Sequence, residues 1–143
     1  MQILRIVPNV SSTLFEASRD FYVELFDLVV SVDLADWYLQ LTPATDQSLN
    51  IGFLPPGHEL FADRASEPGR YSLVLTLQVD DVEEAYARAQ RIGAEIPVHL
   101  RDEDYGQRHF VVVDPNGLLL NVMTPVVTRT PVAAARSAPT SGS

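Results

Sequence analysis

The segment Y-G-Q-R-H-F-V-V-V-D-P-N-G-L-L-L-N-V-M, residues 105–123, holds two apolar runs joined by a short polar turn. Asp-Pro-Asn-Gly at 114–117 has turn chemistry, because proline fixes φ and glycine accepts conformations that other residues avoid. The runs on either side are rich in Val and Leu, so the segment predicts two strands around a turn. One amide, Asn121, interrupts the second run. A buried amide that lacks a hydrogen bond costs about 1–3 kcal/mol, so Asn121 must meet a partner there.

The other elements follow the order β-α-β-β-β, which occurs twice. In the first module the sequence predicts a helix at 14–26 and strands at 3–10, 28–34, 37–42 and 48–54. In the second it predicts a helix from Val82 to Ile92, which Gly93 ends, and strands at 71–79, 95–100, 107–113 and 118–124.

Residue matches between the modules support an internal repeat. The pairs are Tyr22 with Tyr86, Thr42-Pro43 with Asp114-Pro115, and Leu49-Asn50-Ile51 with Leu120-Asn121-Val122. We therefore expect an α+β fold in which residues 1–126 form a single domain of two βαβββ modules. The modules span about 1–56 and 70–126, joined by loop 57–69. Residues 127–143 are rich in Pro, Ala, Ser and Thr, which predicts a flexible tail.

Composition narrows the possible functions. The chain has no Cys, and all ten basic residues are Arg, which excludes disulfides, thiol catalysis, lysine Schiff bases and a P-loop. No apolar run approaches the ~20 residues of a membrane span, and no signal peptide precedes the first strand, so a cytoplasmic location is expected. The net charge of −9 disfavours nucleic acid and suits a neutral or cationic partner. The alternative is that the charge serves solubility alone.

Side chains alternate across each strand, so every predicted strand has two registers. One register is apolar and is expected to pack under the helices: Leu4/Ile6, Leu39/Leu41, Leu49/Ile51/Phe53, Leu73/Leu75/Leu77, Val111/Val113 and Leu120/Val122. The other mixes amides, hydroxyls, aromatics and Met: Arg5/Val7/Asn9, Tyr38/Gln40, Ser48/Asn50/Gly52, Ser72/Val74/Thr76/Gln78, Arg108/Phe110/Val112 and Leu119/Asn121/Met123. This mixed register is typical of a ligand pocket. A sheet face covered by a partner subunit is the alternative.

Three segments, 18–28, 78–94 and 105–117, resemble the vicinal oxygen chelate superfamily of glyoxalases, extradiol dioxygenases, and fosfomycin- and bleomycin-resistance proteins. The resemblance covers residues 3–125 and implies two βαβββ modules forming curved mixed sheets around a cleft. Asp27 stands where the family usually has a Gly that ends the first helix. Asp tolerates the left-handed conformation better than most residues, so the turn should survive.

In the family's enzymes the first and last strands of each module supply metal ligands. The resemblance places those positions at Val7, at Asn50 or a neighbour within 49–53, at Val74 and at Asn121. Valine cannot bind a metal ion and Asn is a poor ligand for a transition ion, so no metal or other cofactor is expected. The resemblance is then closest to the metal-free bleomycin-resistance-type drug-binding proteins, which pair as homodimers.

Other polar groups have plainer interpretations. The sequence predicts a solvated loop position for His58, a strand end for His99, and a packed position in the apolar register for His109. Residues 80–84 predict a helix N-terminus with capping carboxylates, and residues 101–104 a solvated turn.

The predicted ligand-binding residues come from the mixed register, with two aromatic residues at its rim. They are Tyr38, Gln40, Asn50, Thr76, Arg108, Phe110, Asn121 and Met123, with Trp37 and Phe61 at the rim. The predicted function is sequestration of a bulky, partly aromatic or cationic natural product or antibiotic, as in self-resistance. The alternative is a divergent lyase, isomerase or tailoring enzyme that uses Tyr38, Arg108 or His58 for proton transfer.

Overall fold

The computed structural model describes residues 1–61 and 73–127. The chain divides into two compact units, one formed by Met1–Ser72 with Asp114–Leu118 and the other by Leu73–Val113 with Leu119–Ser143. Most of the predicted loop 57–69, the start of the strand predicted at 71–79, and nearly all of the predicted tail 127–143 lie outside the described residues.

Among its described residues, the first unit has one helix, one 3-10 helix and a four-stranded mixed sheet. Its elements are β1 (Asn9–Ser11), α1 (Phe15–Phe26), β2 (Leu28–Asp33), β3 (Leu39–Pro43), β4 (Ile51–Leu54) and η1 (Glu59–Phe61). The sheet order is β1-β4-β3-β2, with β1 parallel to β4 and the other neighbours antiparallel.

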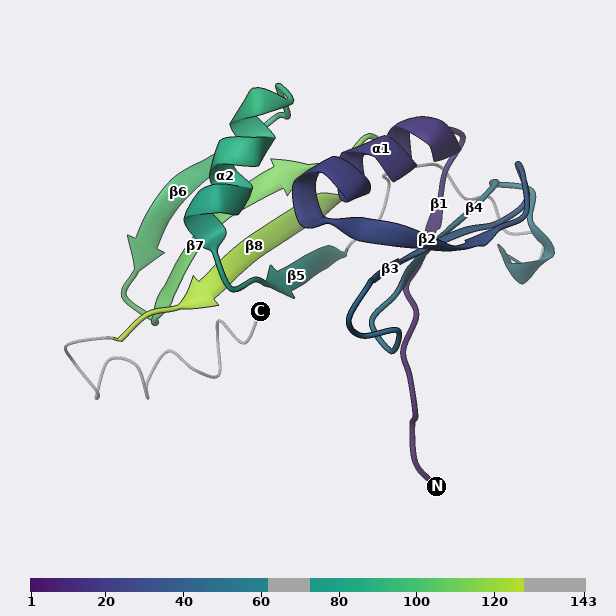
Figure 1. Ribbon diagram of the computed structural model, residues 1–143, viewed down its shortest axis with the longest axis horizontal. Coiled ribbons are helices and arrows are strands. Elements are labelled where there is room, and N and C mark those ends of the chain that lie inside the picture. The colour runs from purple at the N-terminus through teal and green to yellow at the C-terminus, as the bar shows by residue number, and fades with distance from the viewer. Residues whose placement is uncertain (62–72, 128–143) are drawn as a thin grey trace. The chain divides into compact units, whose positions relative to one another are not determined.

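The second unit repeats this plan (Figure 1). Its elements are β5 (Val74–Gln78), α2 (Val82–Arg91), β6 (Val98–Glu103), β7 (Gln107–Val113) and β8 (Leu119–Pro125). The sheet order is β5-β8-β7-β6, and β5 is parallel to β8. The predicted α+β fold of two βαβββ modules is therefore confirmed.

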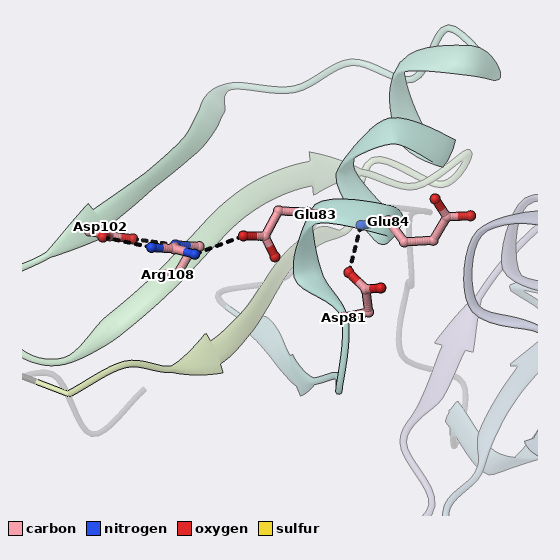
Figure 2. Close-up of polar contacts among 5 residues, drawn as sticks. All are labelled: Asp81, Glu83, Glu84, Asp102 and Arg108. Atoms are coloured by element: carbon pink, nitrogen blue, oxygen red, sulfur yellow. Dashed lines mark hydrogen bonds and ion pairs between the residues drawn. The ribbon is translucent and has the colours of Figure 1, made fainter.

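The helix boundaries follow the sequence signals. Asp27 ends α1 in the left-handed conformation, with φ 58°, and its N–H donates to the carbonyl of Val23, as expected of an Asp in place of Gly. Asp81 caps α2 by accepting from the N–H of Glu84 at 3.0 Å (Figure 2). Gly93, with φ 70°, follows the end of α2.

Each helix covers one apolar sheet face. In the first unit Tyr22 of α1 packs against Phe53 of β4, with ring centroids 5.5 Å apart. In the second unit Tyr86 of α2 packs against Phe110 of β7, with centroids 5.2 Å apart. Burial of these aromatic and aliphatic groups provides most of the driving force for folding.

The Asp-Pro-Asn-Gly turn is bonded into the first unit. The Tyr22 hydroxyl donates to Asp114 Oδ2 at 2.8 Å, and Asn116 Nδ2 donates to Ser18 Oγ at 2.9 Å. The Ser12 hydroxyl donates to Asn116 Oδ1 at 2.6 Å. All these groups are buried, so residues distant in sequence are joined here by a closed polar cluster. Burial raises the pKa of Tyr22 well above its usual value, and the neighbouring Asp114 raises it further.

The first predicted strand is shorter than expected, which corrects part of the predicted core. Regular pairing starts at Asn9, and only an isolated bridge between Ile6 and Leu49 precedes it. Leu4, Ile6, Leu49 and Leu73 are exposed rather than packed under a helix. They lie before the strands begin, where no helix-covered sheet extends over them in the described part of the chain.

In the ranges that the structure describes, no helix has the length and apolarity to cross a membrane.

Candidate functional site

Strand pairing identifies the side chains on the face of the second sheet that points away from α2. Asn121 lies opposite both Thr76 and Val111, and His109 lies opposite Met123. Directly paired residues share a sheet face. This face, here called the helix-free face, therefore carries Thr76, His109, Asn121 and Met123, whereas Phe110 and its neighbours at alternate positions face α2.

A chain of hydrogen bonds crosses this face through all four strands. Glu103 Oε2 lies 2.8 Å from His109 Nε2, and His109 Nδ1 lies 2.7 Å from Asn121 Oδ1. Asn121 Nδ2 donates in turn to Thr76 Oγ1 at 3.3 Å. His109 and Asn121 are buried while Thr76 is exposed. The amide that interrupts β8 thus finds its partners in two neighbouring strands, and we call the four residues the Glu103–Thr76 chain.

Donor and acceptor roles in this chain follow from the atoms in contact. A carboxylate only accepts, so Nε2 of His109 donates to Glu103. Hydrogen bonds from His109 and then from Arg101, whose Nε lies 2.6 Å from the carboxylate, lower the pKa of Glu103.

The helix-free face of the first sheet carries a shorter polar chain. The Tyr38 hydroxyl donates to Gln40 Oε1 at 2.6 Å, and Gln40 Nε2 donates to Ser31 Oγ at 3.1 Å. Gly52 lies beneath the tyrosine, where a Cβ would come within 3.0 Å of its ring and also meet Asn9. Burial raises the pKa of Tyr38, although Arg5 lowers it, so the tyrosine stays neutral at physiological pH.

An aromatic pair stands beside β3. Trp37 stacks on His58 with ring centroids 4.4 Å apart and an interplanar angle of 27°. The predicted solvated position of His58 is wrong: its ring is buried, and Nδ1 accepts from the N–H of Leu60. The indole of Trp37 remains 45% exposed, and Phe61 is half-buried. The exposed indole gives the first unit an aromatic surface.

Asn50 does not reproduce the environment of Asn121. It precedes β4, and its Nδ2 donates to the carbonyl of Gln47 at 2.9 Å. Its Oδ1 is buried and meets no hydrogen-bonding partner among the residues that the structure describes. The two amides are therefore equivalent in sequence but not in structure.

Arg108 and Phe110 lie on the other face of their sheet, which corrects the predicted register of β7. Arg108 bonds Glu83 of α2 at 2.7 Å and Asp102 of β6 at 2.6 Å (Figure 2). Phe110 packs on Tyr86. The Val-Val-Val run of β7 is equally apolar in both registers, so hydropathy could not choose between them. Val111 and Val113, together with His109, share the helix-free face with Asn121.

Sequence reasoning missed His109 and Glu103 as members of a candidate site. His109 was expected in the apolar register, and residues 101–104 were expected in a solvated turn, whereas Glu103 ends β6. Pairing residues outward from the Asp-Pro-Asn-Gly turn would have placed His109 on the same face as Asn121. Val113 pairs with Leu119, so every odd-numbered residue of β7 shares a face with Asn121.

Comparison with known proteins identifies the family. The sequence profile of the Glyoxalase/Bleomycin resistance protein/Dioxygenase superfamily matches residues 9–122. The chain belongs to this superfamily. No curated protein sequence matches it.

Solved structures share the fold over most of the chain. TnmS3, an antibiotic binding protein from Streptomyces sp. CB03234, is 25% identical with a TM-score of 0.69, covering 87% of this chain and 98% of its own. TioX from Micromonospora sp. ML1 is 19% identical with a TM-score of 0.69, covering 85% and 98%. Lactoylglutathione lyase from Agrobacterium tumefaciens is 18% identical with a TM-score of 0.65, covering 86% and 92%.

Two of the positions that the resemblance assigned to metal ligands, Val74 and Asn121, lie in the second unit. Asn121 is bonded to His109 and Thr76, and Val74 is half-exposed at the start of β5. Across residues 1–61 and 73–127 no group of three or more His, Cys, Asp or Glu side chains could hold a metal ion.

Proposed function

We propose that the protein binds a bulky, partly aromatic natural product or antibiotic and sequesters it, as a self-resistance protein does. The Glu103–Thr76 chain carries this proposal. Its polar groups are bonded to one another from strand to strand, so they stand in fixed positions among apolar neighbours such as Met123 and Val111. A preorganised face of this kind loses little entropy when a ligand docks on it.

The involvement of both ring nitrogens of His109 supports binding rather than turnover. Nε2 is bonded to Glu103 and Nδ1 to Asn121, so the imidazole has no nitrogen left for a substrate proton in this arrangement. Likeness to the antibiotic binding protein TnmS3, at 25% identity over 87% of the chain, adds support.

The exposed indole of Trp37 and the acidic chain support the ligand class. Within the first unit by itself, a flat aromatic ligand would stack well on an indole that His58 already holds in place. The net charge of −9 attracts a cationic ligand. We also propose a homodimer without a bound metal ion, to be checked by sedimentation and elemental analysis, and a cytoplasmic location.

A divergent enzyme is the second candidate, and the contact between Glu103 and His109 at 2.8 Å favours it. A carboxylate that orients an imidazole is a common arrangement of a general base. Catalysis would require Asn121 to release Nδ1 so that this nitrogen could take a proton from the substrate.

A ligand screen with product analysis tests the two functions against each other. Purified protein is heated with a panel of polyketide and peptide antibiotics, and a true ligand raises the unfolding temperature, since binding at 100 times Kd adds about 2.7 kcal/mol. Mass spectrometry should then recover that ligand unchanged. A chemically altered ligand would establish the enzyme instead, and a panel without any stabilising compound would count against sequestration of these classes.

Trp37→Leu is the informative variant for the same screen, because it removes the aromatic face but keeps an apolar side chain. It should weaken binding of a flat ligand several-fold. Leu34→Ala is the matched control, since Leu34 is an exposed apolar residue close by in the same turn. Equal affinity of the two variants would exclude stacking on the indole.

A further inference from the structure

We propose that the hydroxyl of Thr76 is the point at which the Glu103–Thr76 chain meets the ligand, and that the ligand offers an acceptor oxygen there, such as a carbonyl. This inference rests on the proposed binding function and deepens it, because it assigns a donor role to one of the predicted ligand-binding residues and a matching chemical group to the ligand.

The direction of hydrogen bonding along the chain is the first argument. Glu103 accepts from Nε2 of His109, Nδ1 of His109 lies 2.7 Å from Asn121 Oδ1, and Asn121 Nδ2 donates to Thr76 Oγ1. The Thr76 oxygen is therefore used as an acceptor by a neighbour within the sheet. Its own hydrogen has no acceptor among the described residues, so the hydroxyl is free to donate outward.

The position of Thr76 is the second argument. The middle members of the chain, His109 and Asn121, are 7% and 8% exposed, so a ligand cannot reach them without a rearrangement. Thr76 belongs to the same chain but is exposed, on the edge strand β5. Thr76 is thus the member of the chain that a ligand can contact directly.

Polarisation along the chain is the third argument. A hydroxyl that accepts a hydrogen bond becomes a stronger donor through its own hydrogen, because successive bonds polarise one another. The bond from Asn121 Nδ2 to Thr76 Oγ1 is the step of the chain that acts on this hydroxyl. The preferred ligand group is consequently an acceptor with concentrated negative charge, as a carbonyl or phenolate oxygen has.

The test compares 9-fluorenone with fluorene, two flat tricyclic aromatic probes that differ by one carbonyl in place of a methylene. Affinities are measured by titration calorimetry on the full chain. The wild-type protein should bind 9-fluorenone between about twofold and tenfold more tightly, as one net hydrogen bond allows. Thr76→Val should abolish that preference with little change in the affinity for fluorene, and Thr76→Ser, which keeps the hydroxyl, should retain it.

The infrared spectrum of bound 9-fluorenone gives a second measurement that needs no variant. Its C=O stretching frequency should fall below the value in an aprotic solvent if a hydroxyl donates to it, and a frequency equal to that value would overturn the proposal. Equal affinity of the wild-type protein for the two probes, or a preference that survives in Thr76→Val, would also overturn it and leave the binding function intact. Failure of both probes to bind would instead count against the proposed aromatic ligand class.

Discussion

The two modules share one backbone plan but carry different chemistry on their helix-free faces. In the first, Tyr38, Gln40 and Ser31 form a neutral chain that presents the tyrosine oxygen as an acceptor. In the second, the Glu103–Thr76 chain is charged and presents a hydroxyl as a donor. Backbone pairing and the helix-covered apolar face maintain each sheet, so the free face can diverge without loss of the fold.

The helix tyrosines differ in the same way. Tyr22 donates to the buried carboxylate of Asp114, a residue 92 positions away in sequence. Tyr86, its counterpart, contacts Nδ1 of His99 at 2.7 Å in an exposed position. In the first module the helix tyrosine therefore bonds a turn distant in sequence, whereas in the second it bonds a residue 13 positions away.

Asp114→Ala should have the largest effect on stability. The carboxylate accepts from the Tyr22 hydroxyl and from the N–H groups of Asn116 and Leu118, each at 2.8 Å. Its loss leaves several buried donors unpaired, so the free energy of unfolding should fall by about 3 kcal/mol or more. Urea denaturation measures this. Asp104→Ala, which removes an exposed carboxylate, is the control and should leave the midpoint where it was.

Asn121→Leu and Asn50→Leu should separate the two amides of the repeat. Replacing Asn121 leaves Nδ1 of the buried His109 without its hydrogen-bonding partner and should lower the free energy of unfolding by about 1–3 kcal/mol. Replacing Asn50 removes an amide whose oxygen is already unpaired, so stability should change little. Urea midpoints of both variants give the comparison, and equal losses would mean that the amides play the same part.

Tyr22→Phe against Tyr86→Phe measures the difference between the helix tyrosines. Tyr22→Phe deletes a buried bond to a carboxylate and should cost about 1–2 kcal/mol. Tyr86→Phe deletes an exposed hydrogen bond and should lower the free energy of unfolding by only a few tenths of a kcal/mol. Paired thermal and urea unfolding would check both, and the comparison fails if Tyr86→Phe is the more damaging.

The pH dependence of stability should show the smallest and most selective effect. The pKa of Glu103 is lowered in the folded state, so its contribution is present above the unfolded pKa and is lost as pH falls through the folded one. The pKa of Tyr38 is raised, so its contribution is present below the unfolded pKa and is lost as pH rises through the folded one. Glu103→Gln should therefore flatten the acid limb of the unfolding-temperature profile and Tyr38→Phe the alkaline limb. The opposite assignment of limbs would contradict the two hydrogen-bond chains.

The amino-acid sequence by itself determined the local features. The duplicated βαβββ order, the left-handed end of α1 at Asp27 and the cap of α2 at Asp81 follow from turn, capping and periodicity signals that act within a few residues. The expectation that Asn121, a polar residue in an apolar strand, needs hydrogen-bonding partners was also confirmed.

Only the tertiary structure decided which partners meet. The Val-Val-Val run of β7 has no preferred face by hydropathy, so hydropathy alone could not fix the register of this strand. Its pairing with β8 places His109 beside Asn121 and puts Phe110 on the face that packs against α2. The bond between Tyr22 and Asp114 likewise joins residues that no local signal connects. Hydrogen bonds between side chains depend on register to within one residue, because a shift of one position moves every side chain to the other face of the sheet.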